Sequence, residues 1–237
     1  MTEQTTVPKE GIFAVYKDEG MTSHDVIDVV RRATREKRVG HGGTLDPCAK
    51  GVLVVGVGRA ATKRLGEVVG TEKEYVTRVK LGWRSTTDDR EGQIEQVEVP
   101  QIPSEEQVRD ALAGFQGIIS QRPPIFSALK IGGRSAYKLA RAKKQVELSE
   151  RPVEAKVVEL IRYEWPFVDV RLVTGPGFYV RSFGRDLGEK LATGGYLEQL
   201  ERTRVGPFTK EQAVTMPDLR RQSTGRGPER PNPEGVL

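Results

Sequence analysis

The apolar run VLVVGV, residues 52–57, limits the fold of this chain more than any other segment. A short run with no polar alternation indicates a strand that is buried in the core. A glycine-rich loop, GHGGTLDP (residues 40–47), leads into it and contains His41 and Asp46, and the only cysteine, Cys48, follows. Since loops beside buried strands often carry function, these three side chains are the first candidates for chemistry.

Strand-like and helix-like patterns are mixed along the chain without a strict strand–helix–strand repeat. We expect strands at 11–16, 75–81, 93–99, 153–165 and 168–174. We expect helices after a cap at Thr22 or Ser23, from Ser104 to Phe115, over 135–144 and over 180–191. This mixture favours the α+β class.

The charge balance permits a polyanionic partner. The chain has 38 Lys and Arg against 33 Asp and Glu, a net charge of +5. Nine basic and three acidic residues fall within 122–156. A single cysteine excludes an intramolecular disulfide framework. No signal peptide and no run of about 20 apolar residues is present, so we expect a soluble cytoplasmic protein.

The loop alone leaves several kinds of site open. Cys48 could be a thiolate nucleophile with His41 nearby, and Asp46 before proline could be only a turn residue. Two histidines and one cysteine give no zinc-type spacing, so we expect no metal. The segment GVGRAA (56–61) fits a dinucleotide fingerprint, but Glu74 precedes a strand where the ribose-binding acid should follow one.

Five segments, in order, resemble the tRNA pseudouridine synthase B family, whose members isomerise the uridine at position 55 in the T loop of tRNA. They are GHGGTLDPCAKGVLVVGVGRAATK (40–63), KEY (73–75), QRPPIFSALKIGGRSAYKLAR (121–141), GFYVRSFGRDLGEKL (177–191) and LERTRVGPF (200–208). The resemblance extends over residues 11–215. It implies a catalytic fold built on a bent, mainly antiparallel mixed sheet flanked by helices.

The resemblance also implies a role for individual residues. Asp46 matches the family's catalytic aspartate, Tyr75 the tyrosine that stacks on the uracil, and Arg181 the arginine that pairs with the aspartate. The implied substrate-binding residues are His41, Tyr179, Leu200, Lys17 and Lys130. The chain departs from the family pattern at Asp18, where proline is usual, and at Phe178, where a small residue is usual. The reaction is an isomerisation, so no cofactor is expected.

The same resemblance implies a domain organisation. We expect a catalytic domain over 1–216, with an inserted RNA-binding arm at about 122–152. We expect a disordered tail over 217–237 and no C-terminal RNA-binding domain of the PUA type. The expected partner is tRNA, bound through its T stem-loop by a monomer, with no membrane and no obligatory protein partner.

The implied chemistry suits these side chains. A carboxylate in a dry pocket has a raised pKa, and a guanidinium beside it opposes that rise. The target base must leave its stack, and an aromatic ring can then stack on it for about 1–3 kcal/mol. Two rivals remain: the guide-RNA-dependent branch of the superfamily and a non-catalytic RNA-binding protein. A dinucleotide enzyme is a weaker third.

Overall fold

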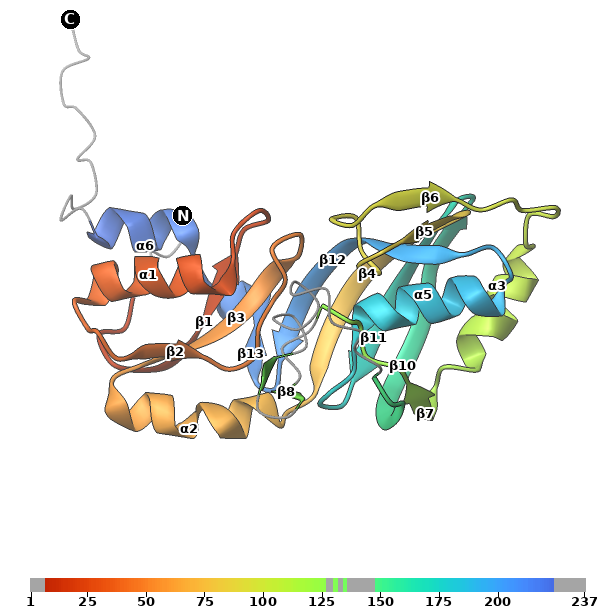
Figure 1. The fold of residues 1–237 in the computed structure, drawn as a ribbon. Helices are drawn as coiled ribbons and strands as arrows, with labels where there is room; N and C mark the ends of the chain where they lie inside the picture. Colours follow the sequence, from red (N-terminus) through yellow and green to blue (C-terminus); the bar gives the residue numbers. More distant parts are fainter. Residues whose placement is uncertain (1–6, 127–129, 132–133, 136–147, 224–237) are drawn as a thin grey trace, which may run out of the picture.

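Ten strands form one sheet in the computed structural model, which describes residues 7–126, 130–131, 134–135 and 148–223 (Figure 1). Its main path runs β14 (Val214–Thr215), β1 (Gly11–Lys17), β3 (Lys50–Val57), β12 (Gly195–Val205), β4 (Lys73–Leu81), β11 (Phe167–Thr174), β10 (Arg151–Glu164) and β7 (Gly117–Gln121). β2 (Val39–His41) pairs with β3, and β13 (Phe208–Thr209) pairs with β12. Only β1–β14 and β3–β12 are parallel, so the expected mixed, mainly antiparallel α+β fold is confirmed.

The run VLVVGV lies in β3 and is buried on both faces. Leu53, Val55 and Val57 belong to the main core, together with residues of helix α1 (Ser23–Thr34). Val52 and Val54 belong to a second cluster, which includes Val68 of helix α2 (Arg59–Val69). A strand covered on two faces has no solvent side, which explains why its sequence lacks polar alternation.

The sheet has a narrow joint between β3 and β12. These strands pair at only two positions, Lys50 with Glu201 and Gly51 with Arg202. Gly51 has φ +114°, and a Cβ placed there would lie 2.2 Å from the carbonyl oxygen of Arg202. Only glycine accepts both the positive φ and this close approach. The joint divides the sheet into one half beside α1 and α2 and another beside α5 (Val180–Lys190) (Figure 1).

The first half of the sheet is covered by three helices. α1 starts at the capping box of Thr22 and Asp25, as its sequence predicts, and packs against α6 (Met216–Ser223). Met216 and Leu219 are fully buried, so the expectation of a disordered tail from 217 is wrong for residues 217–223. Two buried apolar side chains at helical spacing were sufficient to dock this helix. Residues 224–237 lie outside the described residues.

The second half of the sheet carries α5 and α3 (Glu105–Ala113), the latter starting at the predicted cap, Ser104. The strand expected at 93–99 is shorter in the structure: β6 (Ile94–Gln96) forms a separate two-stranded sheet with β5 (Trp83–Ser85).

A 3₁₀ helix, Lys210–Gln212, connects β13 to β14. Within the described residues, no helix is long and apolar enough to cross a membrane.

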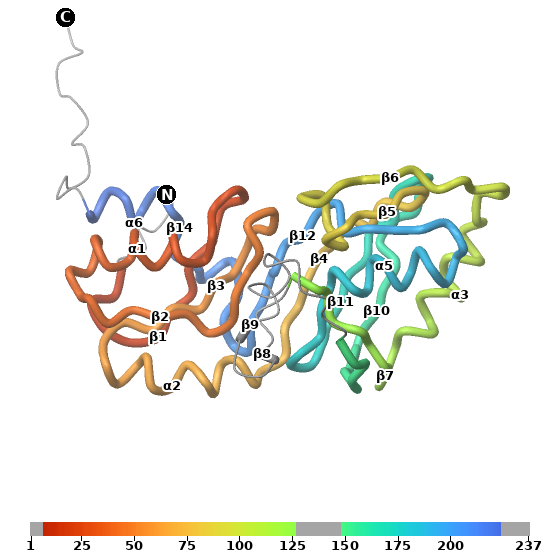
Figure 2. Tube along the Cα trace, in the orientation of Figure 1, coloured from red at the N-terminus to blue at the C-terminus, as the bar shows by residue number. Residues whose placement is uncertain are grey.

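The inserted arm expected at about 122–152 begins and ends at neighbouring positions of the sheet. β7 ends at Gln121 and β10 begins at Arg151, and these two residues are paired across the strands. Figure 2 shows the chain after β7 running back toward the middle of the molecule. Two short strands of the arm, β8 (Lys130–Ile131) and β9 (Arg134–Ser135), pair with each other. The helix expected over 135–144 lies outside the described residues apart from its first position.

The dinucleotide alternative is contradicted by the topology. GVGRAA does join a strand, β3, to a helix, α2, but the next strand, β4, is not a parallel neighbour of β3. β4 runs antiparallel between β11 and β12, so the required βαβ unit is missing. Glu74 lies inside β4 and is paired with Arg171 at 3.1 Å.

Candidate active site

The loop that carries Asp46 connects β2 to β3 and is tied down on both sides of the aspartate. The backbone N–H of Leu45 donates to the Ser23 hydroxyl at 2.9 Å, and that hydroxyl also lies 2.9 Å from the Leu45 carbonyl oxygen. The backbone N–H of Gly20 donates to the Pro47 carbonyl at 2.9 Å. Both ties come from the connection between β1 and α1, which therefore fixes the position of Asp46.

Lys17 has no exposed surface, and the expectation that it faces RNA is therefore wrong. Its Nζ donates to the carbonyls of Met21 (2.7 Å) and Asp18 (3.0 Å) and lies 3.4 Å from that of Pro47. Burial lowers the pKa of Lys17 to about 8. The side chain holds the β1–α1 connection to the Asp46 loop, and a cation enclosed in this way cannot reach a phosphate.

Arg181 lies in the first turn of α5 and grips Asp46 with two nitrogens. Its Nε is 2.9 Å from Oδ2 of Asp46, and its Nη2 is 3.3 Å from Oδ1. Nη2 also donates to the carbonyl of Phe126 at 2.8 Å, and Nη1 lies 3.6 Å from Oδ2 of Asp89. The guanidinium side chain is 8% exposed and that of Asp46 is 31% exposed. This two-point contact fixes the rotamer of the carboxylate.

The electrostatics of Asp46 combine a large penalty with a specific compensation. Burial raises the pKa of the Asp46 carboxyl, while the Arg181 guanidinium is the strongest influence lowering it. Asp89 adds to the rise, because it is a second buried carboxylate beside the same arginine. The outcome is a carboxyl group that depends on Arg181 for its charge.

A cavity of about 570 Å³ opens beside this pair, within the usual range for small-molecule sites. Five of the expected site residues line it: Asp46, Tyr75, Tyr179, Arg181 and Leu200. They come from the β2–β3 loop, β4, the start of α5 and β12. The fold therefore gathers at one place residues that lie far apart in the sequence.

The walls of the cavity are mainly apolar. Tyr75 (6% exposed), Leu200 (8%) and Phe178 (8%) are all buried. Burial raises the pKa of the Tyr75 hydroxyl, so the phenol stays protonated at neutral pH. Tyr179 caps α5, and its N–H and carbonyl both bond to the side chain of Gln121 at the root of the arm. A flat base would therefore enter a largely apolar space whose charged lining residues are one carboxylate, Asp46, and three cations, Lys73, Arg181 and Arg202.

Sequence reasoning missed Arg202, which also lines the cavity. It is 2% exposed, and its guanidinium donates to the carbonyls of Val52 (2.7 Å), Gly43 (3.2 Å) and Thr44 (3.3 Å). It also lies close enough to Tyr75 to lower the pKa of that hydroxyl, against the larger opposite effect of burial. Arg202 thus connects β12 and β3 to the glycine loop, beside the aromatic wall. Its place within the LERTRVGPF segment was the one available signal.

Of the remaining expected substrate-binding residues, His41 does not line the cavity. His41 is half-buried at the end of β2, and burial lowers its pKa, so the imidazole is neutral at pH 7. Its Nδ1 is buried and has no hydrogen-bond partner within the described part of the chain. Lys130 belongs to β8, but its side chain lies outside the described residues.

Cys48 does not fit the nucleophile alternative. Its side chain is buried, and burial raises the pKa of the thiol to about 12. The thiolate that nucleophilic attack requires is therefore absent at neutral pH. Cys48, Asp89 and Glu91 lie close enough to share a metal ion. However, Oδ1 of Asp89 already accepts hydrogen bonds from the Thr87 hydroxyl and the Glu91 backbone N–H, and Oδ2 faces Arg181.

Comparison with known proteins gives a consistent relationship. Residues 31–180 match the description "TruB family pseudouridylate synthase (N terminal domain)", and residues 181–227 match "tRNA pseudouridylate synthase B C-terminal domain". A tRNA pseudouridine synthase B of Thermobifida fusca is 46% identical over 223 residues, which are 91% of this chain and 76% of that protein. One of Corynebacterium diphtheriae is 44% identical over 216 residues, 88% of this chain and 72% of that protein.

Solved structures agree in fold. An H/ACA RNP bound to a substrate RNA containing 2′-deoxyuridine has a chain with TM-score 0.67 and 26% identity, covering 93% of this chain and 57% of that one. A Cbf5–Nop10–Gar1 complex has a chain with TM-score 0.67 and 27% identity, covering 91% of this chain and 59% of that one. This chain thus spans less than two thirds of those structures' chains.

Proposed function

Because this chain belongs to the TruB family of pseudouridylate synthases, we propose that it isomerises uridine to pseudouridine in tRNA, at position 55 of the T loop. The observation that carries the proposal is the Asp46–Arg181 pair beside a cavity of about 570 Å³ walled by Tyr75 and Leu200. This arrangement offers one carboxyl group, held by a guanidinium, in a space with the size and mainly apolar walls that suit a flipped base.

The reaction conserves atoms and electrons. The bond between ribose C1′ and uracil N1 breaks, a bond between C1′ and C5 forms, a proton leaves C5, and N1 gains a proton. Asp46 supplies the carboxylate that drives the break, whether by attack or by elimination. The detached uracil must turn without escaping, which requires a closed pocket around it.

The neighbouring side chains have separate tasks. Arg181 opposes the rise in the pKa of the Asp46 carboxyl that burial causes, and it holds the carboxyl in one rotamer. Tyr75 stacks on the uracil, and its hydroxyl, protonated at neutral pH and close to Arg202, is a candidate for moving a proton. Leu200 and Phe178 exclude water and keep the base in place. Tyr179 joins the α5 cap to the root of the arm through Gln121.

Binding must also supply the energy that takes the uridine out of its stack, about a few kcal/mol. Phosphate contacts provide a sequence-independent part of this energy. The enzyme acts as a monomer in the cytoplasm and takes tRNA through its T stem-loop, with residues 122–152 as an arm over the RNA. The first residues of the arm support this assignment, because the Phe126 carbonyl accepts a hydrogen bond from the Arg181 guanidinium.

A second candidate is guide-RNA-dependent modification. It is favoured by the likeness to chains solved in an H/ACA RNP and in a Cbf5–Nop10–Gar1 complex. A guide-dependent enzyme needs additional RNA and protein to present its target. Conversion of a T stem-loop hairpin by the purified chain alone would exclude this candidate.

The test is pseudouridine mapping on unmodified tRNA transcripts with the wild type, Asp46→Asn and Asp18→Asn. Asp18 is exposed, so its change to asparagine is a matched control for the loss of one carboxylate. We expect the wild type and Asp18→Asn to modify the T-loop uridine alone. Asp46→Asn should bind tRNA but lose at least about a thousandfold in rate.

Each contrary outcome has a clear meaning. Full activity of Asp46→Asn would reduce Asp46 to a turn residue. Binding of tRNA without conversion by the wild type would identify a non-catalytic RNA-binding protein. Conversion of other uridines in preference to the T-loop position would refute the assigned specificity.

A further inference from the structure

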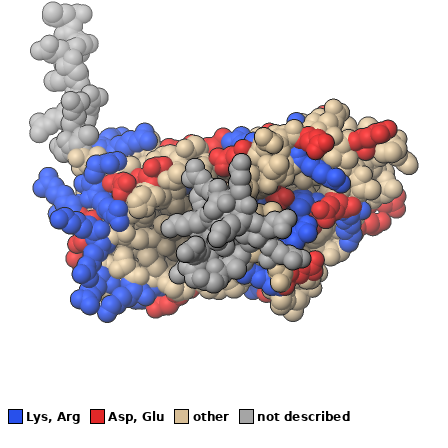
Figure 3. Space-filling model, viewed as in Figure 1, with Lys and Arg blue, Asp and Glu red and all other residues tan. Residues whose placement is uncertain are grey.

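Exposed cations from three separate segments gather at one end of the molecule, at the left in Figure 3. We call this surface the basic end. Its residues are Arg32, Arg35, Lys37 and Arg38 at the end of α1, Arg59, Lys63 and Arg64 on α2, and Arg220 on α6. All eight side chains are exposed.

The three segments form one continuous surface. The carbonyl of Arg38 accepts a hydrogen bond from the N–H of Gly58 at 2.8 Å, which places Arg38 next to Arg59. Arg32 and Arg220 line the same surface hollow between α1 and α6. Residues almost 190 positions apart thus contribute charge to one face.

This charge is poorly compensated. Of the eight cations, only Arg64 forms an ion pair within the described residues, with Glu67 at 3.3 Å. A segment at the opposite end has the reverse balance: residues 94–110, which include β6 and most of α3, have five acidic residues and one basic residue.

Helix stability does not explain the basic end. Cations at the end of α1 are favoured by the helix dipole. Arg59, Lys63 and Arg64, however, lie in the first half of α2, where the dipole disfavours cations, and the first turn of α2 has no acidic residue. Because these cations make the N-terminal half of α2 less stable, their presence there indicates a role other than helix stability.

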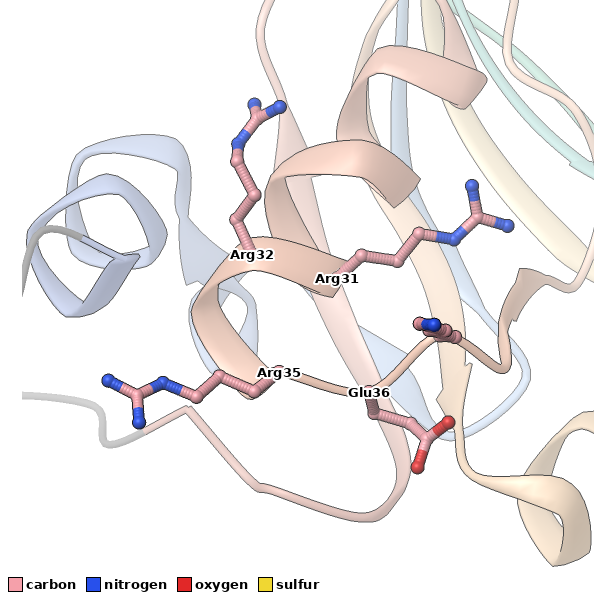
Figure 4. A pocket seen from close by; sticks show the side chains of 5 residues that line it. Arg31, Arg32, Arg35 and Glu36 are labelled. Carbon is pink, nitrogen blue, oxygen red and sulfur yellow. The ribbon is translucent and has the colours of Figure 1, made fainter.

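The arginines do not converge on one point. In Figure 4, Arg31, Arg32 and Arg35 point in different directions, and the carboxylate of Glu36 shares the hollow that they line. A small anion needs donors that meet, whereas an extended polyanion needs charges spread along a surface. The side chains therefore suit an RNA backbone better than a free phosphate.

The basic end lies at a defined distance from the cavity. α1 begins at Thr22 and Ser23, which line the cavity, and ends at the basic end. α2 begins at the basic end and ends at Val69, which also lines the cavity. At 1.5 Å per residue, helices of 11 and 12 residues separate the two sites by roughly 17–18 Å.

We propose that the basic end is a second, sequence-independent RNA-binding surface that contacts tRNA phosphates outside the T stem-loop. This inference rests on the proposed function. A hairpin whose loop occupies the cavity reaches the near edge of this surface at most. A complete tRNA is large enough to lie across this surface. Each phosphate that a cation neutralises there increases the affinity and makes it more dependent on salt.

The test compares two triple variants with the same change in net charge. One is Arg32→Gln, Arg35→Gln and Lys63→Gln at the basic end. The control is Arg84→Gln, Arg109→Gln and Arg162→Gln, exposed cations on β5, α3 and β10. Each is measured for binding across a salt series and for conversion, with a complete tRNA transcript and with an isolated T stem-loop hairpin.

We expect the basic-end variant to bind complete tRNA about tenfold more weakly at low salt, with a salt slope smaller by about two units. Its affinity for the hairpin and its conversion of the hairpin should stay within about twofold of wild type. The control variant should stay within about twofold of wild type on both RNAs, because its three cations lie on β5, α3 and β10, away from the basic end.

Three results would overturn the proposal: unchanged binding of complete tRNA, equal loss in both variants, or equal loss on tRNA and hairpin. The last would move the contact onto the T stem itself. Failure of the proposed function is visible separately, because it would appear as a wild type that converts neither RNA while the binding measurements still report on the surface.

Discussion

Arg181 and Arg202 both reach the Asp46 loop from outside it, and they are satisfied in different ways. Arg181 faces two carboxylates, those of Asp46 and Asp89. Arg202 donates to three backbone carbonyls, and it has no ion pair within the described residues. Both are less than one tenth exposed.

The difference separates two uses of a buried guanidinium. The charge of Arg181 is balanced, so its main effect falls on the protonation and orientation of Asp46. The hydrogen bonds of Arg202 hold the glycine loop against β3 and β12, while its charge is left without a direct counter-charge. Arg202 also lowers the pKa of Asp46, but less than Arg181 does.

The largest effect should come from Arg181→Met. Without the guanidinium, the Asp46 carboxyl loses both its fixed rotamer and its main counter-charge. We therefore expect the rate to fall by roughly a hundredfold to a thousandfold, which is about 3–4 kcal/mol in activation free energy. The pKa of Asp46 should also rise further, since its main stabilising charge is gone. The acid limb of the pH–rate profile should then move to higher pH, because more of the carboxyl is protonated at each pH.

Arg181→Lys is the control for charge without the two-point grip. It should restore the position of the acid limb and only part of the rate. If the acid limb of Arg181→Met stays in place, Arg181 does not control the protonation of Asp46. The role that distinguishes Arg181 from Arg202 would then be refuted.

Arg202→Met should act mainly on stability. It leaves three carbonyls without their donor, so the free energy of unfolding should fall by roughly 2–4 kcal/mol, measured by chemical denaturation. The rate of the folded protein should fall about tenfold, and its acid limb should move less than that of Arg181→Met. A larger shift of the acid limb than in Arg181→Met would reverse the two assignments.

Lys17 extends the comparison to a third buried cation, and its effect should be the smallest. Lys17→Met removes donors from the carbonyls of Met21 and Asp18 but also removes a buried charge. We expect a loss of about 1–2 kcal/mol in unfolding free energy, with tRNA affinity and its salt slope unchanged. A salt slope smaller by about one unit would instead reveal a phosphate contact.

Regular periodicity and helix caps predicted much of the fold. The alternating residues of β4, the caps Thr22 and Ser104, and the continuous apolar run of β3 all lie where the sequence placed them. β12 was missed because register shifts after Leu197 and Arg202 interrupt its alternation and because Arg202 occupies a buried position. From the sequence alone, a strand with a charged residue at a buried position is easily interpreted as a loop.

The site shows the same limit. Asp46 and Arg181 are 135 positions apart, so no local pattern joins them, and only the family resemblance predicted their pairing. Lys17 was expected to bind substrate only because its segment resembles an RNA-facing one of the family, and the sequence alone does not show that this side chain is enclosed. The carbonyls that enclose Lys17 and Arg202 come together only through tertiary structure, and the roles of both side chains depend on those carbonyls.

The paired residues Gln121 and Arg151 have a consequence for protein engineering. An insertion whose two ends are neighbours on adjacent strands can change in length without changing the register of the sheet, and loop closure becomes only slowly less favourable with length. The part of this insertion that follows Phe126 can therefore be treated as an exchangeable module. The boundary for such an exchange is set on the inner side by Phe126, whose carbonyl must remain available to Arg181.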